Sequence, residues 1–356
     1  MDARTSNKVL KSCVRRLVLA GLAIPIACAV TLAQDRASQI DSLAQQYHDL
    51  RLFNGAVLVA EDGDVIYKKG FGYANLEWGI PNQTNTKFRI GSVTKQFTAV
   101  IVLQLVEEGV LSLDGKIVDY LPDYPRPAGE QITIHHLLTH SSGIPNYTSL
   151  PDFFPEMSRD PYEPLEFLAV FSGLELEFEP GAKWSYSNSG YFLLGAIIEA
   201  VTGKPYDRVL RERLLRPLGL DDTGYDHYEE IIERRAAGYE TTFTGYENAA
   251  YLDTALPYAA GSLYSTVEDL QKWDRALYSD ALFSDQHYRE LMFTPHIGDY
   301  GYGFFIRKVP VGGAGDSVKV IEHGGGINGF ITGVRRFVDG GHLIVLMDNT
   351  SSSVAG

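Results

Sequence analysis

The stretch Arg89-Ile-Gly-Ser-Val-Thr-Lys-Gln-Phe97 places a serine three residues before a lysine, at the start of an apolar run typical of a buried helix. Side chains at positions i and i+3 of a helix lie on one face and can touch. Ser92 and Lys95 could therefore form the hydroxyl and amine pair that serine acyl-transfer enzymes use. A purely structural alternative has Ser92 as the helix cap and Lys95 in solvent, because serine is a favoured cap residue. Since a cation in the first turn opposes the helix dipole, the pattern favours a further role for the lysine.

The segments on both sides of this stretch predict a sheet that is built from both ends of the chain. Residues 54–60 and 65–69 flank a turn and are typical of an antiparallel hairpin, and an amphipathic helix is expected over residues 38–51. Apolar segments such as 97–110 and 190–201, joined by Pro, Gly and Asn loops, predict helices. Strand patterns return near the C-terminus, at residues 302–306, 318–321, 330–337 and 342–347.

These patterns predict an α/β (α+β) fold with an antiparallel sheet flanked by helices. Residues 34–115 and 295–356 are expected to form the sheet region, and residues 116–294 a mainly helical insertion. With 356 residues the chain is long enough for one large core. Its 45 acidic and 31 basic side chains give a net charge of −14, which disfavours nucleic acid as a partner.

Residues 1–33 have the layout of a signal peptide. Basic residues between positions 8 and 16 precede an apolar run over residues 17–30, and cleavage is expected after Ala33. The run is interrupted by Pro25 and is shorter than the roughly 20 apolar residues of a membrane span. Both cysteines, Cys13 and Cys28, lie in this leader, so the mature protein is expected to contain no disulfide. We therefore predict export to the periplasm or the outside of the cell, with lipid attachment at Cys28 left open.

Two further motifs occur in contexts that suit an active site. Tyr186-Ser-Asn188 lies in a loop just before a strongly apolar helix, where side chains can project into a cleft. His323-Gly-Gly-Gly326 lies at the end of one predicted strand, where glycine lets the backbone approach a ligand. The structural alternatives are a loop that only satisfies turn backbone and a glycine-rich hairpin corner. A His-Gly-Gly-Gly run also marks the oxyanion loop of lipase-type hydrolases, but this sequence has no Gly-x-Ser-x-Gly elbow.

His136 and His140 stand four residues apart on a predicted helix, a spacing that could bind zinc. The run around them lacks the adjacent glutamate of a metalloprotease helix, and no third ligand is evident. We therefore expect these histidines to have packing or capping roles. Neither a metal ion nor an organic cofactor is expected.

Ser92-Val-Thr-Lys95, Tyr186-Ser-Asn188 and His323-Gly-Gly325, in that order, resemble the three active-site motifs of the class C β-lactamase and DD-peptidase superfamily of serine hydrolases. Supporting segments are similar as well, among them Ile132-Thr-Ile-His-His-Leu-Leu-Thr-His-Ser-Ser-Gly143, Glu179-Pro-Gly181 and Ala260-Gly-Ser-Leu-Tyr-Ser-Thr266. The resemblance covers nearly all of residues 34–356, which are expected to form one β-lactamase-related catalytic domain. It implies a β-lactamase/transpeptidase-like fold.

The resemblance also implies roles for the residues of the first two motifs. Ser92 would attack a carbonyl and become acylated, while Lys95 and Tyr186 handle its proton, and either of the two could be the base. Asn188 would hold the lysine and the substrate amide. A base role requires the pKa of Lys95 to fall by roughly three units, or about 4 kcal/mol, so we expect Lys95 to be buried.

The third motif departs from the pattern of many β-lactamases, which carry Lys-Thr-Gly there. His323 with an ordinary pKa of about 6.5 would be mostly neutral at pH 7, and glycine in place of threonine removes a hydroxyl. Recognition of an anionic β-lactam or a C-terminal D-Ala carboxylate is then less assured, and a neutral ester or amide becomes comparably favoured. By similarity, Gly325 belongs to the substrate-binding strand, and the backbone N–H groups of Ser92 and Gly326 form the oxyanion hole.

The function predicted from the sequence is an exported serine hydrolase that acts through an acyl-enzyme on an amide, peptide or ester. The predicted partner is a small-molecule or peptide substrate with a scissile carbonyl, and no stable membrane span is expected after signal cleavage. The alternative is a non-hydrolytic penicillin-binding or scaffolding protein that keeps the fold. The family usually ends with a helix packed on the sheet, whereas this sequence stops a few residues after its last predicted strand, so we expect either a truncated sequence or a different cover on one face of the sheet. Nothing in the sequence predicts an oligomeric state.

Overall fold

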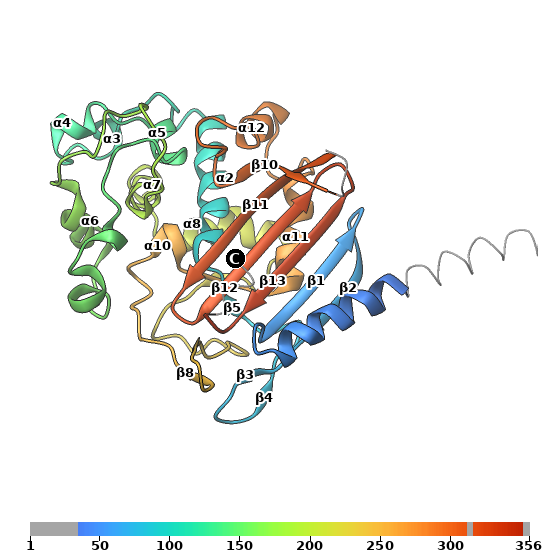
Figure 1. The fold of residues 1–356 in the computed structure, drawn as a ribbon. Helices are drawn as coiled ribbons and strands as arrows, with labels where there is room; N and C mark the ends of the chain where they lie inside the picture. Colours follow the sequence, from blue (N-terminus) through green and yellow to red (C-terminus); the bar gives the residue numbers. More distant parts are fainter. Residues whose placement is uncertain (1–34, 312–315, 352–356) are drawn as a thin grey trace, which may run out of the picture. The chain divides into compact units, whose positions relative to one another are not determined.

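A six-stranded antiparallel sheet joins the early and late strands of the chain (Figure 1). The computed structural model describes residues 35–311 and 316–351, and the predicted signal peptide with its two cysteines lies outside these residues. The strand order is β10-β11-β12-β13-β1-β2, and β1 pairs with β13 along its whole length. The strands are β1 (Gly55–Glu61), β2 (Asp64–Gly70), β10 (Phe305–Pro310), β11 (Ser317–Ile327), β12 (Phe330–Phe337) and β13 (His342–Asp348). The predicted antiparallel sheet from both chain ends is confirmed.

Smaller sheets and helices occupy the sequence between these strands. The small sheets pair β3 (Tyr73–Asn75) with β4 (Ile80–Pro81), β9 (Leu263–Ser265) with β5 (Phe88–Arg89) and β6 (Gly224–Tyr225), and β7 (Tyr239–Thr241) with β8 (Tyr246–Asn248). The helices are α2 (Thr94–Glu107), α3 (Ile117–Tyr120), α4 (Arg126–Gly129), α5 (Ile134–Leu138), α6 (Pro164–Ser172), α7 (Asn188–Thr202), α8 (Tyr206–Leu210), α9 (Arg216–Leu218), α10 (Tyr258–Gly261), α11 (Val267–Leu277) and α12 (Gln286–Met292). Short 3₁₀ turns are η1 (Gly91–Val93) and η2 (Tyr147–Ser149), and π-helical turns are η3 (Phe153–Met157) and η4 (Arg211–Leu215).

Two strand boundaries differ from the sequence prediction. The strand expected at residues 302–306 begins only at Phe305, because the N–H of Tyr302 bonds to the end of α12 and the N–H of Gly301 closes a turn. Strand β11 does not end before the run His323-Gly-Gly-Gly326 but continues through it to Ile327. The glycines pair in register with β12, so the run is the C-terminal part of β11, which ends one residue after Gly326.

Helix α2 is the central helix of the structure. Its residues 94–103 are all buried, and the stretch from Ala99 to Leu103 is apolar on every side of the helix. Helix α11 packs on β1 and β13, and its Trp273 connects the sheet side to α2. The indole stacks on Phe97 with ring centroids 4.0 Å apart and donates to Oε1 of Gln96 at 2.9 Å. The beginning of α2, which carries Lys95, is therefore fixed by packing on several sides.

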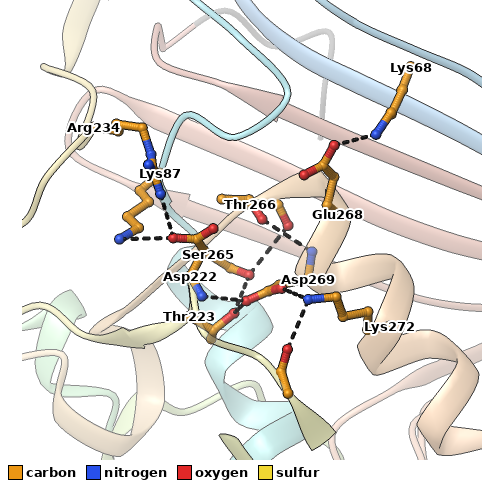
Figure 2. A network of polar contacts seen from close by, with 11 residues as sticks. Lys68, Lys87, Asp222, Thr223, Arg234, Ser265, Thr266, Glu268, Asp269 and Lys272 are labelled. Atoms are coloured by element: carbon orange, nitrogen blue, oxygen red, sulfur yellow. Dashed lines mark hydrogen bonds and ion pairs between the residues drawn. The ribbon is translucent and has the colours of Figure 1, made fainter.

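A polar network ties α11 to the chain that leads into η1 (Figure 2). Asp269, in the first turn of α11, accepts hydrogen bonds from the N–H of Asp222 at 2.9 Å and the hydroxyl of Thr223 at 3.0 Å. The carboxylate of Asp222 forms ion pairs with Lys87 at 3.1 Å and Arg234 at 2.8 Å. Lys87 directly precedes β5, which leads into η1, so this network positions the approach to Ser92.

A buried asparagine connects the end of β13 to the loops around β1. The amide of Asn349 donates to the carbonyls of Tyr73 at 3.1 Å and Ala237 at 2.8 Å. Its Oδ1 accepts from Asn54 at 2.7 Å and from Asn82 at 3.1 Å. The side chain is fully buried, and its hydrogen-bonding capacity is filled.

Replacement Asn349→Ala is expected to lower the free energy of unfolding by about 3 kcal/mol, because it leaves buried amide and carbonyl groups without partners. Urea unfolding followed by circular dichroism measures this loss. Gln131→Ala, at an exposed position, is the control and should change stability by less than about 0.5 kcal/mol. A similar small effect at both positions would show that the network does not stabilise the fold.

Residues 35–49 form one helix, in place of the predicted 38–51, and belong to a unit separate from Leu50 onward. Within this helix, Gln39 donates to Asp35 at 2.9 Å and Gln45 donates to Asp49 at 2.8 Å. Across the residues that the structure describes, no helix is both long enough and apolar enough to cross a membrane.

Candidate active site

Ser92 lies in the 3₁₀ turn η1, directly before helix α2. The turn begins at Gly91 with a φ of +48°, and α2 starts at Thr94, three residues earlier than the predicted Phe97. In a 3₁₀ turn, side chains at i and i+3 eclipse one another. Nζ of Lys95 accordingly lies 3.0 Å from Oγ of Ser92. The spacing of three residues thus brings the two side chains into contact, with Ser92 in the 3₁₀ turn and Lys95 in the first turn of α2.

Lys95 is fully buried, and the hydrogen-bond contacts of its amine are with uncharged groups. Besides its contact with Ser92, the amine donates to Oδ1 of Asn188 and to the carbonyl of Ala260, both at 2.8 Å. Burial lowers the pKa of Lys95 well below its usual value. A neutral amine has two N–H donors and one lone pair, so two carbonyl oxygens can take the donors while the lone pair faces the Ser92 hydroxyl.

Tyr186 lies over the same amine. Nζ of Lys95 is 4.9 Å from the centroid of the Tyr186 ring. Burial raises the pKa of the Tyr186 phenol, and a side-chain hydrogen bond with Ser92 lowers it in part. The phenol is therefore held in its protonated form next to Ser92.

Asn188 is the first residue of α7, and a neighbouring loop fixes both its backbone and its side chain. Its N–H donates to Oδ1 of Asn146 at 3.0 Å, and its Nδ2 donates to the hydroxyl of Thr148 at 3.2 Å. These contacts leave Oδ1 of Asn188 directed at Lys95. The orientation of the amide thus makes it an acceptor for the amine.

His323 is buried in β11 and is held as a neutral ring. Its Nδ1 lies 2.6 Å from the carbonyl of Gly324, so Nδ1–H is the donor, and its Nε2 lies 3.0 Å from the hydroxyl of Tyr300, from which it accepts. Burial lowers the pKa of His323 to about 3. The expectation of an ordinary histidine pKa is wrong here, because the side chain points into the protein and not into solvent.

Because His323 is neutral in the folded protein, the free energy of unfolding is expected to fall as the pH decreases from 6.5 toward 3. The folded-state pKa of about 3 lies below the unfolded-state value of about 6.5, so the unfolded chain binds more protons in this window. At about pH 4.5 this costs about 3 kcal/mol relative to about pH 7. Urea unfolding at both pH values should show a pH-dependent loss that is smaller by about this amount in His323→Gln. Equal losses in both proteins would contradict a buried neutral His323.

The glycines of β11 let the strand approach η1. A Cβ on Gly325 would lie 1.9 Å from the carbonyl of Ile90 and 3.1 Å from the N–H nitrogen of Ser92. A Cβ on Gly324 would meet nothing closer than the carbonyl of Thr332 at 3.7 Å. Of these two positions, only Gly325 must be glycine, because only there does the backbone of residues 90–92 come too close for a Cβ. This close contact places the following residue, Gly326, beside Ser92.

A cavity of about 100 Å³ opens next to Ser92 and Gly326. None of the described residues that line it carries a charged side chain. Its walls include aromatic and aliphatic side chains, namely Tyr147, Phe153, Phe154, Leu252, Pro257 and Ile327. The geometry can therefore accept an uncharged, apolar group beside the serine.

A larger cavity, of about 780 Å³, lies elsewhere in the helical region. Tyrosines and carboxylates such as Tyr228, Glu163 and Asp207 line it, and Ser92 and Lys95 do not. We assign the site to the smaller cavity, because Ser92 lines it and the hydroxyl of Ser92 contacts the buried amine of Lys95 behind it.

The structure brings the predicted residues Ser92, Lys95, Tyr186 and Asn188 into one cluster, with Gly326 at the same cavity. His323 lies beside this cluster, with its ring 6.3 Å from that of Tyr186, but both of its nitrogens are engaged by the protein. Gly325 lies against the backbone of residues 90–92.

Sequence reasoning missed the carbonyl of Ala260 and the support from Asn146 and Thr148. Ala260 begins a segment that the family resemblance singled out, but a carbonyl contact has no residue signature of its own. Of the two histidines weighed as zinc ligands, His136 accepts the N–H of Thr133 at 3.2 Å at the start of α5. His140 is buried beyond the end of that helix. No group of three metal-binding side chains occurs among the described residues.

An antiparallel sheet from both chain ends, a helical insertion and a serine–lysine pair next to the sheet define the β-lactamase/transpeptidase-like class of proteins. The chain belongs to the Beta-lactamase family, whose model matches residues 40–355. The family resemblance predicted from the three motifs and the predicted fold class are therefore confirmed.

Individual relatives include penicillin-binding proteins and an amidohydrolase. Penicillin-binding protein 4* of Bacillus subtilis (strain 168) is 30% identical over 343 residues, which cover 89% of this chain and 73% of that protein. A penicillin binding protein from Bacillus halodurans has 28% identity and a TM-score of 0.74, with 86% and 94% of the two chains covered. A D-stereospecific amidohydrolase from Streptomyces sp. has 30% identity and a TM-score of 0.71, with 83% and 89% covered. The chain spans about half to three quarters of the length of the curated relatives it matches.

Proposed function

We propose that this protein is an exported serine hydrolase that forms an acyl-enzyme on Ser92 and cleaves an amide, a peptide or an ester. The observation that carries the proposal is the buried amine of Lys95, 3.0 Å from the Ser92 hydroxyl and bonded to two carbonyl oxygens. Its lowered pKa favours the neutral form that a general base requires. Tyr186 is the weaker candidate for the base, because burial raises the pKa of its phenol.

In the acylation step, the lone pair of Lys95 takes the Ser92 proton while Oγ forms a bond to the carbonyl carbon of the substrate. The carbonyl oxygen becomes an oxyanion. The N–H groups of Ser92 and Gly326 are the proposed donors to it, and the N-terminal end of α2 adds a favourable dipole. Collapse of this intermediate breaks the bond to the leaving group.

Tyr186 is the proposed donor of the proton that the leaving group needs. Its phenol is protonated, lies over the Lys95 amine and hydrogen-bonds with Ser92. The proton that Lys95 received then returns to Tyr186. Water attacks the acyl ester in the second half of the reaction by the same route in reverse, and Ser92 is restored.

The site favours substrates whose recognised group is uncharged. The residues described around the cavity include no charged side chain, and His323 is neutral with both ring nitrogens engaged. A carboxylate would find no cation there to offset the loss of its hydration. We therefore place a neutral ester or amide ahead of a β-lactam or a peptide ending in D-Ala.

The proposal is tested by labelling and turnover. The mature protein is incubated with a fluorescent fluorophosphonate and a fluorescent penicillin, and turnover is followed with two matched esters, p-nitrophenyl butyrate and p-nitrophenyl hydrogen succinate. We expect labelling by the fluorophosphonate, turnover of both esters, and a kcat/KM for the butyrate at least about tenfold higher. Preference for the succinate would contradict the neutral substrate.

The same assay separates the hydrolase from the non-hydrolytic alternative. Labelling without turnover of either ester would indicate a protein that is acylated but does not release the acyl group. Absence of labelling by both reagents would refute a nucleophilic Ser92.

Replacement Gly325→Ala is expected to slow acylation by about 100-fold, because a Cβ 1.9 Å from the Ile90 carbonyl must push β11 away from η1. This separates the two proposed oxyanion donors, at Ser92 and Gly326. Gly324→Ala is the matched control, since its Cβ has room. Stopped-flow measurement of acylation compares the two variants, and equal rates would show that the strand position is not critical.

A further inference from the structure

His140 contacts the chain on both sides of Tyr186. Its backbone carbonyl accepts the N–H of Ser185 at 2.9 Å, and its Nδ1 accepts the N–H of Ser187 at 3.2 Å. Its imidazole lies against the Tyr186 ring, with centroids 4.3 Å apart and planes at 35°. One residue thus holds the backbone before and after Tyr186 and packs on the side chain between them.

The backbone of His140 adopts the left-handed conformation, with a φ of +56°. It directly follows α5 and its C-cap Thr139. Residues other than glycine rarely adopt this conformation, and they keep it where contacts with the surrounding structure hold it in place. Here both the carbonyl and the side chain of His140 reach residues 185–187.

The imidazole of His140 also contains a buried nitrogen that has no hydrogen-bond partner among the described residues. Since Nδ1 accepts from Ser187, the proton of the neutral ring is on Nε2, and Nε2 is buried with no hydrogen-bond partner among the described residues. Burial, with Lys95 and His323 nearby, lowers the pKa of His140 well below its usual value. A buried donor without a partner is unfavourable, and an apolar ring would avoid it. The feature that requires histidine is therefore the Nδ1 acceptor.

We propose that His140 is a positioning residue, which fixes the phenol of Tyr186 against Ser92 and Lys95 through its Nδ1 bond to Ser187. This inference rests on the proposed function, because it assigns the phenol a part in the proton transfer. Without the Nδ1 bond, the loop loses one of the two backbone contacts that flank Tyr186. The phenol of Tyr186 is then no longer held over the amine of Lys95, and proton transfer from the phenol to the leaving group slows.

Two variants at His140 test the role of Nδ1. Asparagine and glycine both tolerate the left-handed backbone, but only asparagine offers an acceptor, Oδ1, at the place of Nδ1 in the side chain. The kcat/KM for hydrolysis of butyranilide, whose aniline leaving group must be protonated, is expected within about threefold of wild type in His140→Asn and about 30-fold lower in His140→Gly. Equal rates in the two variants would overturn the proposal. If the glycine variant does not fold, His140→Phe, which keeps a ring but has no acceptor, replaces it.

A double-mutant cycle with Tyr186→Phe separates positioning from a general loss of structure. If His140 acts through the phenol, His140→Gly lowers the kcat/KM for butyranilide by less than about threefold once Tyr186 has lost its hydroxyl. Additive losses would overturn the proposal.

Hydrogen exchange measured by mass spectrometry gives a readout that does not depend on activity. Peptides that contain Ser185 and Ser187 should exchange faster in His140→Gly and as in wild type in His140→Asn. Unchanged exchange in the glycine variant refutes the role of His140. Failure of the wild-type protein to label or turn over refutes the proposed function instead, so the two failures are distinguishable.

Discussion

Replacement Ser92→Ala is expected to abolish fluorophosphonate labelling and to lower kcat/KM for p-nitrophenyl butyrate by about 10⁴-fold or more. The reason is that Oγ of Ser92 is the group that forms the covalent bond. The alanine variant keeps the buried amine of Lys95 and the cavity, but it has no nucleophile for the amine to activate. Stability should change little, because Ser92 is only half-buried.

The labelled position can be read from a tryptic digest. Cleavage after Arg89 and Lys95 releases the peptide of residues 90–95, which holds two hydroxyl side chains, those of Ser92 and Thr94. Thr94 is buried, and its hydroxyl accepts the N–H of Leu263 at 3.2 Å, so the adduct is expected on Ser92. Ser172→Ala, in α6, is the control and should label as wild type does. An adduct that persists in Ser92→Ala would place the nucleophile elsewhere.

The contact between Ser92 and Lys95 could be predicted because it is local. A separation of three residues brings the side chains together in either kind of helical turn, so the contact forms although Ser92 lies in a 3₁₀ turn and Lys95 in α2. The sheet could be predicted for a related reason, since its strands are long and show clear strand patterns. The antiparallel pairing of β1 with β13 then joins the two chain ends.

The contacts that hold the side chains of the site in place could not be predicted, because they depend on backbone groups and on the path of distant loops. The carbonyl of Ala260 reaches Lys95 across 165 residues of sequence, and any residue type could supply it. The low pKa of His323 follows mainly from its burial, which is a tertiary feature, so the residue type alone suggested an ordinary value. His140 was recognised as a packing residue, but its left-handed backbone and its contacts around Tyr186 are tertiary features.

Replacement Lys95→Ala is expected to slow acylation by about 10³-fold while changing the apparent substrate affinity by less than about threefold. The amine lies behind the nucleophile and does not line the cavity, so its loss removes the proton acceptor and not a binding contact. Lys95→Met, which fills more of the buried space, is the matched variant and should lose as much activity with less loss of stability. Single-turnover kinetics with p-nitrophenyl butyrate separates the two parameters. Equal effects on rate and affinity would argue against the base role.

The pH dependence of acylation tests the same assignment independently. Burial lowers the pKa of Lys95 well below its usual value, so the active neutral amine predominates above that lowered pKa and is lost as the pH falls through it. The wild-type rate should therefore rise with pH to a plateau, and this rise should disappear in Lys95→Ala. His323, whose pKa is about 3, should contribute no inflection near pH 6.5. A rise that persists unchanged in Lys95→Ala would transfer the base role to another group, with Tyr186 as the nearest phenol.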